Sequence, residues 1–201
     1  MSGPEGERVA DLSFPVTGEA IARDYAHGLE RALFLALDWL EAEEAAGVHP
    51  IRGLAESGAG MLVSRRTRIV LRLPASRLEA AAHLAGRSFD LGGTVELGAP
   101  AVRDLVPYPV LYSRLVAIGP EDAGEFDAAA RRMAEEAGVK CEIIVGRKRE
   151  GSRGPERFAG FGLMLHGLSP EDSLRMQSSG LGTNRTLGCG IFIPHKSIAP
   201  V

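Results

Sequence analysis

The strongest constraint on the fold is an order of helix and strand signals that occurs twice along this 201-residue chain. In the first half, apolar residues at every third or fourth position predict a long amphipathic helix, and alternating apolar and polar residues predict strands. The predicted elements are a strand over 9–16, a helix over 18–46, extended segments over 48–53 and 61–73, a helix over 78–84 and a hairpin or bulged strand over 89–97. This half therefore has the order β-α-β-β-α-β.

The second half repeats that order with stronger local signals. The clearest signal is Ser169-Pro170-Glu171-Asp172, which places a capping serine, a proline and two acids at the start of a helix that ends at Gly180. The predicted elements are a strand over 110–118, a helix over 121–137, a strand over 141–145, a polar basic loop over 147–157, a strand over 158–166, the helix after Ser169 and a closing strand over 190–193.

Two copies of this order predict an α+β fold with two tandem ferredoxin-like (RRM-like) β-α-β-β-α-β domains. We place the N-terminal domain at residues 1–99, a Pro-rich linker at 100–109 and the C-terminal domain at 110–201. The chain is long enough for two cores, since domains of roughly 100 residues are common. A fold by itself assigns no function. The same architecture nevertheless occurs in RNA-recognition modules.

Composition narrows the class of protein and the kind of partner. The net charge is −3 with an isoelectric point near 6.0, so a nucleic-acid partner has to be held by a local basic patch. Cys141 and Cys189 lie far apart without metal-ligand spacing, which predicts free thiols in a reducing compartment, no metal and no cofactor. The N-terminus has no apolar signal core, and Asp38 and Glu41 interrupt the most hydrophobic helix. We therefore expect a cytoplasmic protein without a membrane span.

Residues 180–190 contain two Gly-X-Gly units, each with an apolar middle residue, on either side of five mostly polar residues. Glycine allows positive φ and close approach of another backbone, so paired glycines predict a loop pressed against a ligand or a helix end. Exposed N–H groups in such a loop attract phosphate. The alternative is a glycine-rich turn into a last strand. The candidate RNA contacts in this loop are Gly180, Gly182, Asn184, Arg185, Gly188 and Gly190.

The setting of this loop resembles the glycine-rich loop of the CRISPR-associated endoribonucleases that process precursor CRISPR RNA. In both, a helix precedes the two Gly-hydrophobic-Gly units and a strand follows them near the C-terminus. The segments that are similar to the Myxan-subtype branch of type I systems are Ser173-Leu174-Arg175, Asn184-Arg185, Gly190-Ile191-Phe192-Ile193-Pro194 and His49-Pro50-Ile51-Arg52-Gly53. The resemblance covers nearly the whole chain in the order of its elements, and it is residue-specific mainly in the last quarter and around His49.

The resemblance implies metal-independent cleavage within the repeat RNA, in which the 2′-hydroxyl attacks in line and leaves a 2′,3′-cyclic phosphate and a 5′-hydroxyl. Such chemistry needs a base, an acid and cations for the phosphorane charge. Histidine suits proton transfer near neutral pH. The candidates are His27, one turn after Arg23, and His49, in the loop after the helix; either can be the base while the other assists. Arg52 is the cation nearest to His49, and Tyr25 is a candidate partner although it points to a different helix face from His27.

A cluster of positive charge lies within residues 147–157, where five basic residues outnumber two acids. A cationic segment of this kind can enter an RNA groove or bind phosphates. The alternative is an ordinary solvated face. The candidate RNA-binding residues in this segment are Arg147, Lys148, Arg149, Arg153 and Arg157.

The partner implied by the resemblance is the repeat of precursor CRISPR RNA, with other CRISPR effector-complex subunits as further partners. A second hypothesis is a non-catalytic RNA-binding subunit of an effector complex, with the same fold and loop. A third is a small-molecule or nucleotide enzyme. Against the third, the glycine stretch lacks the Gly-Lys-Ser/Thr ending of a P-loop and follows a helix instead of a strand.

Overall fold

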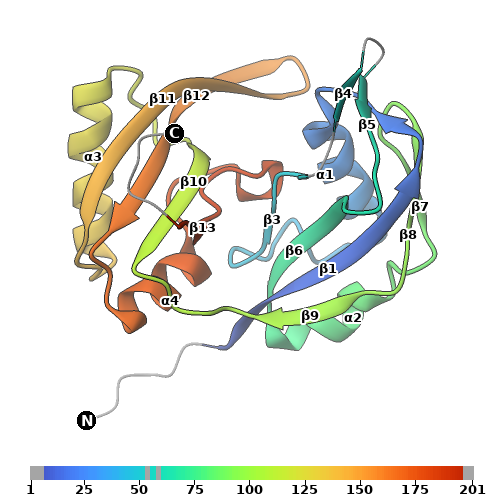
Figure 1. The fold of residues 1–201 in the computed structure, drawn as a ribbon, viewed down its shortest axis with the longest axis horizontal. Helices are drawn as coiled ribbons and strands as arrows, with labels where there is room; N and C mark the ends of the chain where they lie inside the picture. Colours follow the sequence, from blue (N-terminus) through green and yellow to red (C-terminus); the bar gives the residue numbers. More distant parts are fainter. Residues whose placement is uncertain (1–6, 53–54, 58–59, 197–201) are drawn as a thin grey trace. The chain divides into compact units, whose positions relative to one another are not determined.

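The computed structural model describes residues 7–52, 55–57 and 60–196, and the chain divides after Leu105 into two units (Figure 1). Each unit combines helices with antiparallel sheets. Gly53, residues 1–6 of the first predicted domain and residues 197–201 of the second lie outside the described residues. Within the described part of the chain, no helix is long and apolar enough to cross a membrane.

The main sheet of the first unit is built around β1 (Val9–Gly18), which pairs antiparallel with its neighbours. The strand order is β3-β6-β1-β8-β7, and β9 also pairs with β1. The other strands of this sheet are β3 (Gly47–Val48), β6 (Arg68–Pro74), β7 (Ser88–Asp90), β8 (Thr94–Leu97) and β9 (Ala101–Asp104). Leu12, Phe14 and Val16 of β1 are buried in the core, so the residues between them point to the opposite face.

Two helices of the first unit pack on one face of this sheet. They are α1 (Tyr25–Ala36) and α2 (Leu78–Ala82), the second preceded by a single 3-10 turn. The core joins Leu29 and Leu33 of α1 and Ala81 of α2 to the inward-facing residues of β1 and β6. A smaller sheet contains β2 (Ala20–Ile21), β5 (Gly60–Leu62) and β4 (Ala55–Ser57).

Helix α1 is shorter than the helix predicted over 18–46, so that prediction was wrong at both ends. Before α1, Ala20–Ile21 form β2 and pair with β5. After it, residues 37–46 fold into successive turns in which Leu37 and Leu40 stay buried. The spacing of the apolar residues therefore predicted which side chains are buried. Contacts with other parts of the chain determined which of these residues belong to a helix.

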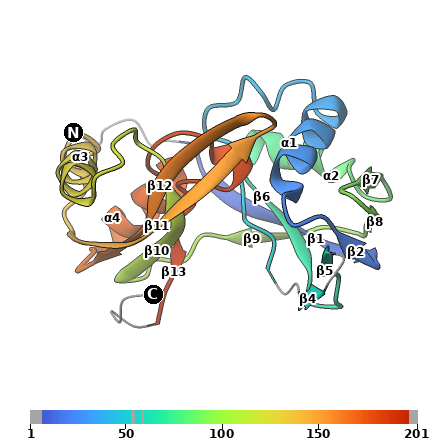
Figure 2. The same ribbon diagram turned by 90° about the horizontal axis from the view of Figure 1, so that it is seen from above.

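The second unit has the strand order β11-β12-β10-β13, with α3 and α4 packed on one face (Figure 2). Its core contains Phe126 and Ala130 of α3 and Met176 of α4. The elements are β10 (Val110–Val116), α3 (Ala123–Glu136), β11 (Glu142–Arg153), β12 (Glu156–His166), α4 (Pro170–Ser179) and β13 (Ile193–Pro194).

The predicted ends of the last helix are confirmed. The Ser169 hydroxyl oxygen accepts a hydrogen bond from the Asp172 N–H at 3.0 Å, and Pro170 is the first helical residue. Gly180 ends α4 with φ 66°, a conformation that glycine adopts at little cost.

Three segments differ from their sequence predictions. Residues 147–157, predicted as a loop, are the paired ends of β11 and β12, joined by a tight turn in which Gly154 has φ 60°. The polar end of a hairpin has no core to face, so it lacks the apolar alternation that predicts strands. In the predicted linker, Ala101–Asp104 form β9 by backbone pairing with β1, which requires no particular side chains. The closing strand is confined to Ile193–Pro194.

Candidate active site

Two strands of the first unit and the residue that follows a third bring an aspartate, an arginine and a histidine to the sheet face opposite α1 and α2. Asp11 in β1 lies directly across from Arg72 in β6, and Arg72 lies directly across from Gly47 in β3. His49 follows Gly47 by two positions and so shares its face. The intervening residues of β1 and β6 point into the core. The alternation of the strands therefore collects three polar side chains on one surface.

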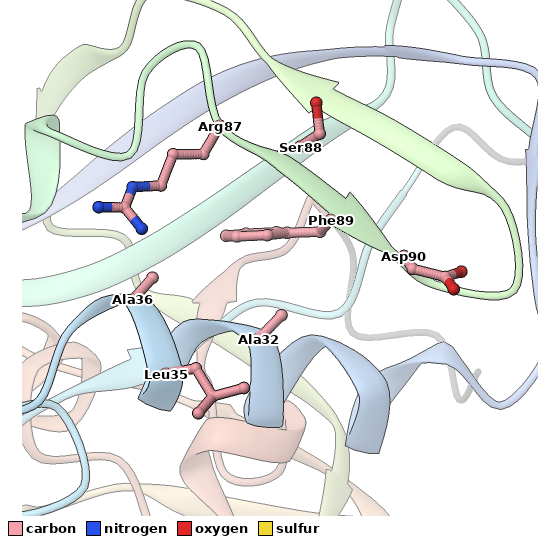
Figure 3. A pocket seen from close by; sticks show the side chains of 7 residues that line it. All are labelled: Ala32, Leu35, Ala36, Arg87, Ser88, Phe89 and Asp90. Atoms are coloured by element: carbon pink, nitrogen blue, oxygen red, sulfur yellow. The ribbon is translucent and has the colours of Figure 1, made fainter.

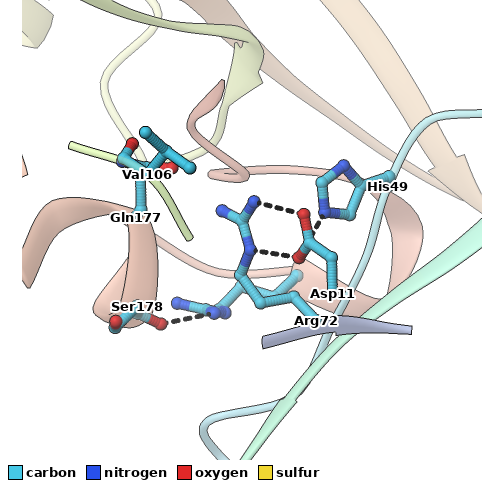
Figure 4. A network of polar contacts seen from close by, with 7 residues as sticks. Asp11, His49, Arg72, Val106, Gln177 and Ser178 are labelled. Atoms are coloured by element: carbon cyan, nitrogen blue, oxygen red, sulfur yellow. Dashed lines mark hydrogen bonds and ion pairs between the residues drawn. The ribbon is translucent and has the colours of Figure 1, made fainter. Parts of the chain in front are cut away.

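These three side chains form a hydrogen-bonded network (Figure 4). Arg72 Nε donates to Asp11 Oδ1 at 2.7 Å, and Arg72 Nη2 donates to Oδ2 at 3.0 Å. His49 Nε2 lies 3.1 Å from Asp11 Oδ1. The Arg72 side chain is 1% exposed, that of His49 is 13% exposed and that of Asp11 is 18% exposed. The bidentate geometry is the strong form of an arginine–carboxylate pair.

Burial and charge set the protonation of this network. Burial by itself raises the pKa of Asp11, but the hydrogen bonds from His49 and Arg72 outweigh it and hold that pKa well below its usual range. Burial lowers the pKa of His49, and the positive charges of Arg72 and Arg52 act in the same direction, while Asp11 partly offsets them. At neutral pH the network therefore contains an aspartate anion and a neutral imidazole.

Tyr25 and Arg52 lie around the same segment. Tyr25, the first residue of α1, accepts a hydrogen bond from the Ile51 N–H through its hydroxyl oxygen at 2.7 Å. Arg52 is exposed and forms an isolated bridge with Arg68 of β6. The helix start therefore supports the segment that carries His49 and Arg52, and this places Tyr25 as a support for that segment.

His27 has a different environment from His49. Its side chain is 32% exposed, and its Nδ1 lies 3.7 Å from the carboxylate of Glu30, which is 3% exposed. Within the described residues, Nδ1 is buried without a hydrogen-bond partner. Nδ1 of the ring therefore lies beside a buried acid and has no hydrogen bond to a described residue that would fix its position.

Asp11 and Arg72 were not among the predicted site residues. The residues next to Asp11 and Arg72 in their strands are apolar and lie in the core. Ionisable residues on the other face of such a strand are normally exposed to solvent. The signal for a shared site is their cross-strand pairing, which a single strand's sequence does not contain.

The two Gly-X-Gly units lie against each other in the second unit. Gly180 and Gly190 have φ 66° and 64°, and a Cβ on Gly190 would collide with the carbonyl oxygen of Leu181. A Cβ on Gly182 would collide in the same way with the carbonyl oxygen of Ala117. The Thr183 N–H also donates to that oxygen at 3.0 Å. These glycines allow the loop to lie directly against other backbone of the same unit. The Thr183 N–H is hydrogen-bonded within the protein.

The polar residues inside this loop also bind the protein itself. Asn184 takes the left-handed conformation at φ 61°, and its carbonyl accepts the N–H groups of Leu187 and Cys189. Arg185 Nη2 donates to the Ser178 carbonyl at 3.0 Å, near the C-terminal end of α4. A cation at that end is favourable because the helix dipole is negative there. Both side chains are half-buried.

The predicted basic segment is a two-stranded hairpin in which most of the charge is exposed. Arg147, Arg153 and Arg157 are exposed, as is Lys148, which pairs with Glu121 at 2.8 Å. Arg149 is half-buried, and within the described residues its Nε has no hydrogen-bond partner. The hairpin thus carries a surplus of positive charge along two paired strands.

The described part of the first unit also has an open groove of about 390 Å³ between α1 and β7 (Figure 3). It is lined by Ala32, Leu35, Ala36, Arg87, Ser88, Phe89 and Asp90. Leu35 is 85% exposed. None of the predicted catalytic residues lines it, so the groove is separate from the polar network. Among the described residues, no group of three or more His, Cys, Asp or Glu is placed to hold a metal ion.

The fold is similar to solved structures that include a CRISPR-associated protein and a RAMP protein. One structure, described as CRISPR associated protein Cas6, has a TM-score of 0.69 at 8% identity and covers 94% of this chain and 100% of its own. Another, described as a RAMP protein binding different RNA substrates, has a TM-score of 0.66 at 12% identity, with 91% and 98% coverage. At these identities the likeness establishes the class of fold alone.

Sequence comparison gives the family. The Cas6 CRISPR family model matches residues 10–197. The CRISPR-associated endonuclease Cas6 of Myxococcus xanthus (strain DK1622) is 37% identical over 193 residues, which cover 95% of this chain and 84% of that protein. This chain therefore belongs to the Cas6 family, and the resemblance noted in the sequence is confirmed.

Proposed function

We propose that this chain is a metal-independent endoribonuclease that cleaves precursor CRISPR RNA within the repeat. Membership of the Cas6 family and the name of the Myxococcus relative support a nuclease. The RAMP protein described as binding RNA supports RNA as the ligand. One observation carries the proposal: the bond between His49 Nε2 and Asp11 leaves Nδ1 of a neutral imidazole as a proton acceptor.

In the proposed reaction, the 2′-oxygen upstream of the scissile phosphate attacks phosphorus while His49 Nδ1 accepts its proton. The new P–O2′ bond closes the 2′,3′-cyclic phosphate, the P–O5′ bond breaks, and the leaving oxygen takes up a proton from solvent water to become the 5′-hydroxyl. Arg52 is close enough to lower the pKa of His49, and its charge stabilises the oxygens of the phosphorane. Tyr25 holds the segment in place through Ile51.

We assign His27 an assisting role. No hydrogen bond within the described residues orients its Nδ1, whereas His49 is oriented by a carboxylate. An oriented ring is the better base, because proton transfer requires alignment with the hydroxyl. His27 remains the second candidate for the base, and its replacement separates the two assignments.

RNA binding is proposed for the second unit. The exposed arginines of the β11–β12 hairpin are suited to phosphate contacts. In the glycine loop, Asn184 and Arg185 are the proposed additional RNA contacts. The conformation of this loop depends on Gly180, Gly182, Gly188 and Gly190. We further propose that both units are ferredoxin-like domains. In the first unit β3, β6 and β1 are neighbours in that order and β9 also pairs with β1, and in the second unit the order is β11-β12-β10-β13. Numbered by their order along the chain, both sets of four strands have the order 2-3-1-4.

The reaction class is tested with a labelled repeat RNA and its 2′-deoxy analogue at the scissile position. We expect cleavage of the ribose substrate to continue in EDTA and the deoxy substrate to remain uncut, because it lacks the attacking oxygen. The 5′ product should end in a cyclic phosphate, detected by mass spectrometry. Cleavage of the deoxy substrate would contradict the mechanism. Binding without any cleavage would favour the non-catalytic RNA-binding subunit.

The hairpin is tested by two charge-matched double variants. Arg147→Gln with Arg157→Gln should reduce the slope of log affinity against log salt concentration by about 1.4 to 1.8, because each lost phosphate contact contributes roughly 0.7 to 0.9. Arg132→Gln with Lys140→Gln removes the same charge from exposed positions outside the hairpin and should leave the slope nearly unchanged. Equal changes in both doubles, measured by filter binding, would show that net charge alone matters.

A further inference from the structure

Asp11 and Arg72 form an ion pair at a buried position, where removing charged groups from water costs free energy. Arg72 is 1% exposed, and the ionised side chains lose most of their hydration there. An unpaired buried charge is strongly destabilising, and a paired one often adds no stability over a well-packed apolar pair. The pair therefore calls for an explanation other than stability, and the third member of the network supplies one.

The carboxylate of Asp11 joins the arginine to the histidine. Its Oδ1 accepts from Arg72 Nε and lies 3.1 Å from His49 Nε2, while its Oδ2 accepts from Arg72 Nη2. An ionised carboxylate only accepts hydrogen bonds, so the hydrogen of a neutral His49 ring has to be on Nε2. Nδ1 then carries the lone pair, and within the described residues nothing is hydrogen-bonded to it.

We propose that Asp11 is the positioning residue for His49, and that Arg72 keeps Asp11 ionised and fixed in place. This inference rests on the proposed function, since it assigns how the base is prepared. Asp11 selects the imidazole tautomer with Nδ1 free, holds the ring orientation, and stabilises the imidazolium that forms when the 2′-hydroxyl proton arrives. A histidine held by a carboxylate through its other nitrogen is a recurring device in catalytic and metal sites.

The charged groups around His49 make the effect of Asp11 measurable. Asp11 from β1 raises the pKa of His49, whereas Arg72 from β6 and Arg52 from the segment after β3 lower it. Arg103 of β9 lies directly across from Asp11 and is exposed. Removing the aspartate charge leaves only the positive groups, so the pKa of His49 should fall further. The acid limb of the pH–rate profile, where the base loses its proton, should then move to lower pH.

The first arm of the test compares wild-type protein with Asp11→Asn and Asp11→Glu in single-turnover cleavage of the repeat RNA. We expect Asp11→Asn to lose about 10- to 100-fold in rate, the range found for partners that orient metal-binding histidines, with an acid limb at lower pH. Asp11→Glu should recover part of the rate and the original limb. Asp38→Asn, at an exposed position of the same unit, is the matched control and should change neither.

The second arm needs no variant and no RNA. In the folded wild-type protein, the ¹⁵N chemical shifts of the His49 ring should report hydrogen on Nε2 and a lone pair on Nδ1 above the titration range. The opposite tautomer would overturn the inference even if Asp11→Asn failed to fold. An Asp11→Asn protein with the wild-type rate and limb would also overturn it while leaving the proposed function intact. A wild-type protein that never cleaves the repeat would refute the proposed function instead.

Discussion

Replacing His49 with alanine is expected to slow repeat cleavage by about 10²- to 10⁴-fold, the range that a general base contributes. The change removes the proposed base and leaves Asp11 paired with Arg72 through both carboxylate oxygens. Because the ion pair persists and His49 lies outside the apolar core, the fold should be retained. Single-turnover cleavage with saturating protein measures the rate, and filter binding measures affinity, which should change little.

Two other histidines serve as comparisons. His27→Ala should cost less than roughly 10-fold, because an assisting group contributes less than the base itself. His83, exposed at the end of α2, should be replaceable without effect. A larger loss in His27→Ala than in His49→Ala would transfer the role of base to His27 and contradict our assignment.

Gly190→Ala should lower the free energy of unfolding by about 2 to 4 kcal/mol. Alanine at φ 64° costs roughly 1 kcal/mol. The new Cβ would also collide with the Leu181 backbone carbonyl, and a forced shift of this kind costs roughly 1 to 3 kcal/mol more. Urea unfolding followed by circular dichroism measures the difference. Loss of repeat binding should accompany it, because the same glycine holds the loop that carries Asn184 and Arg185.

Gly167→Ala separates the two terms of that estimate. Gly167 has φ 71°, and a Cβ there would meet nothing within 4 Å, so only the conformational cost of about 1 kcal/mol should remain. Equal destabilisation by both variants would show that the close approach of the two Gly-X-Gly units contributes nothing to stability.

Local signals in the sequence predicted helices and strands best where the residues that make the stabilising contact are close together in the sequence. The start of α4 is an example, since the serine that caps the helix and the aspartate whose N–H it binds are three residues apart. The helix predicted over 18–46 failed because its ends depend on partners elsewhere in the chain. Ala20–Ile21 pair with β5, and the turns after α1 bury Leu37 and Leu40 without a helix.

The same difference between local and long-range contacts applies to the candidate site. The sequence singled out Tyr25, His27, His49 and Arg52. The structure connects Tyr25 to the segment after His49 through the Ile51 N–H. The sequence did not indicate Asp11, which lies 38 positions before His49. The basic residues of 147–157 were recognised from charge alone, but their arrangement as a paired hairpin was not, because a polar hairpin end carries no apolar alternation.

The order of elements, the glycine spacing, the basic cluster and the residues that resemble the Cas6 family follow from the sequence by itself, because each is a pattern of neighbouring residues. The tertiary structure alone decided that Arg72 pairs with Asp11 and that Asp11 lies within hydrogen-bond distance of His49. Cross-strand pairing brings together residues that are far apart in sequence, and the hydrogen bond to the ionised Asp11 carboxylate selects which nitrogen of the neutral imidazole is protonated. Such a relation depends on strand register, which no single segment encodes.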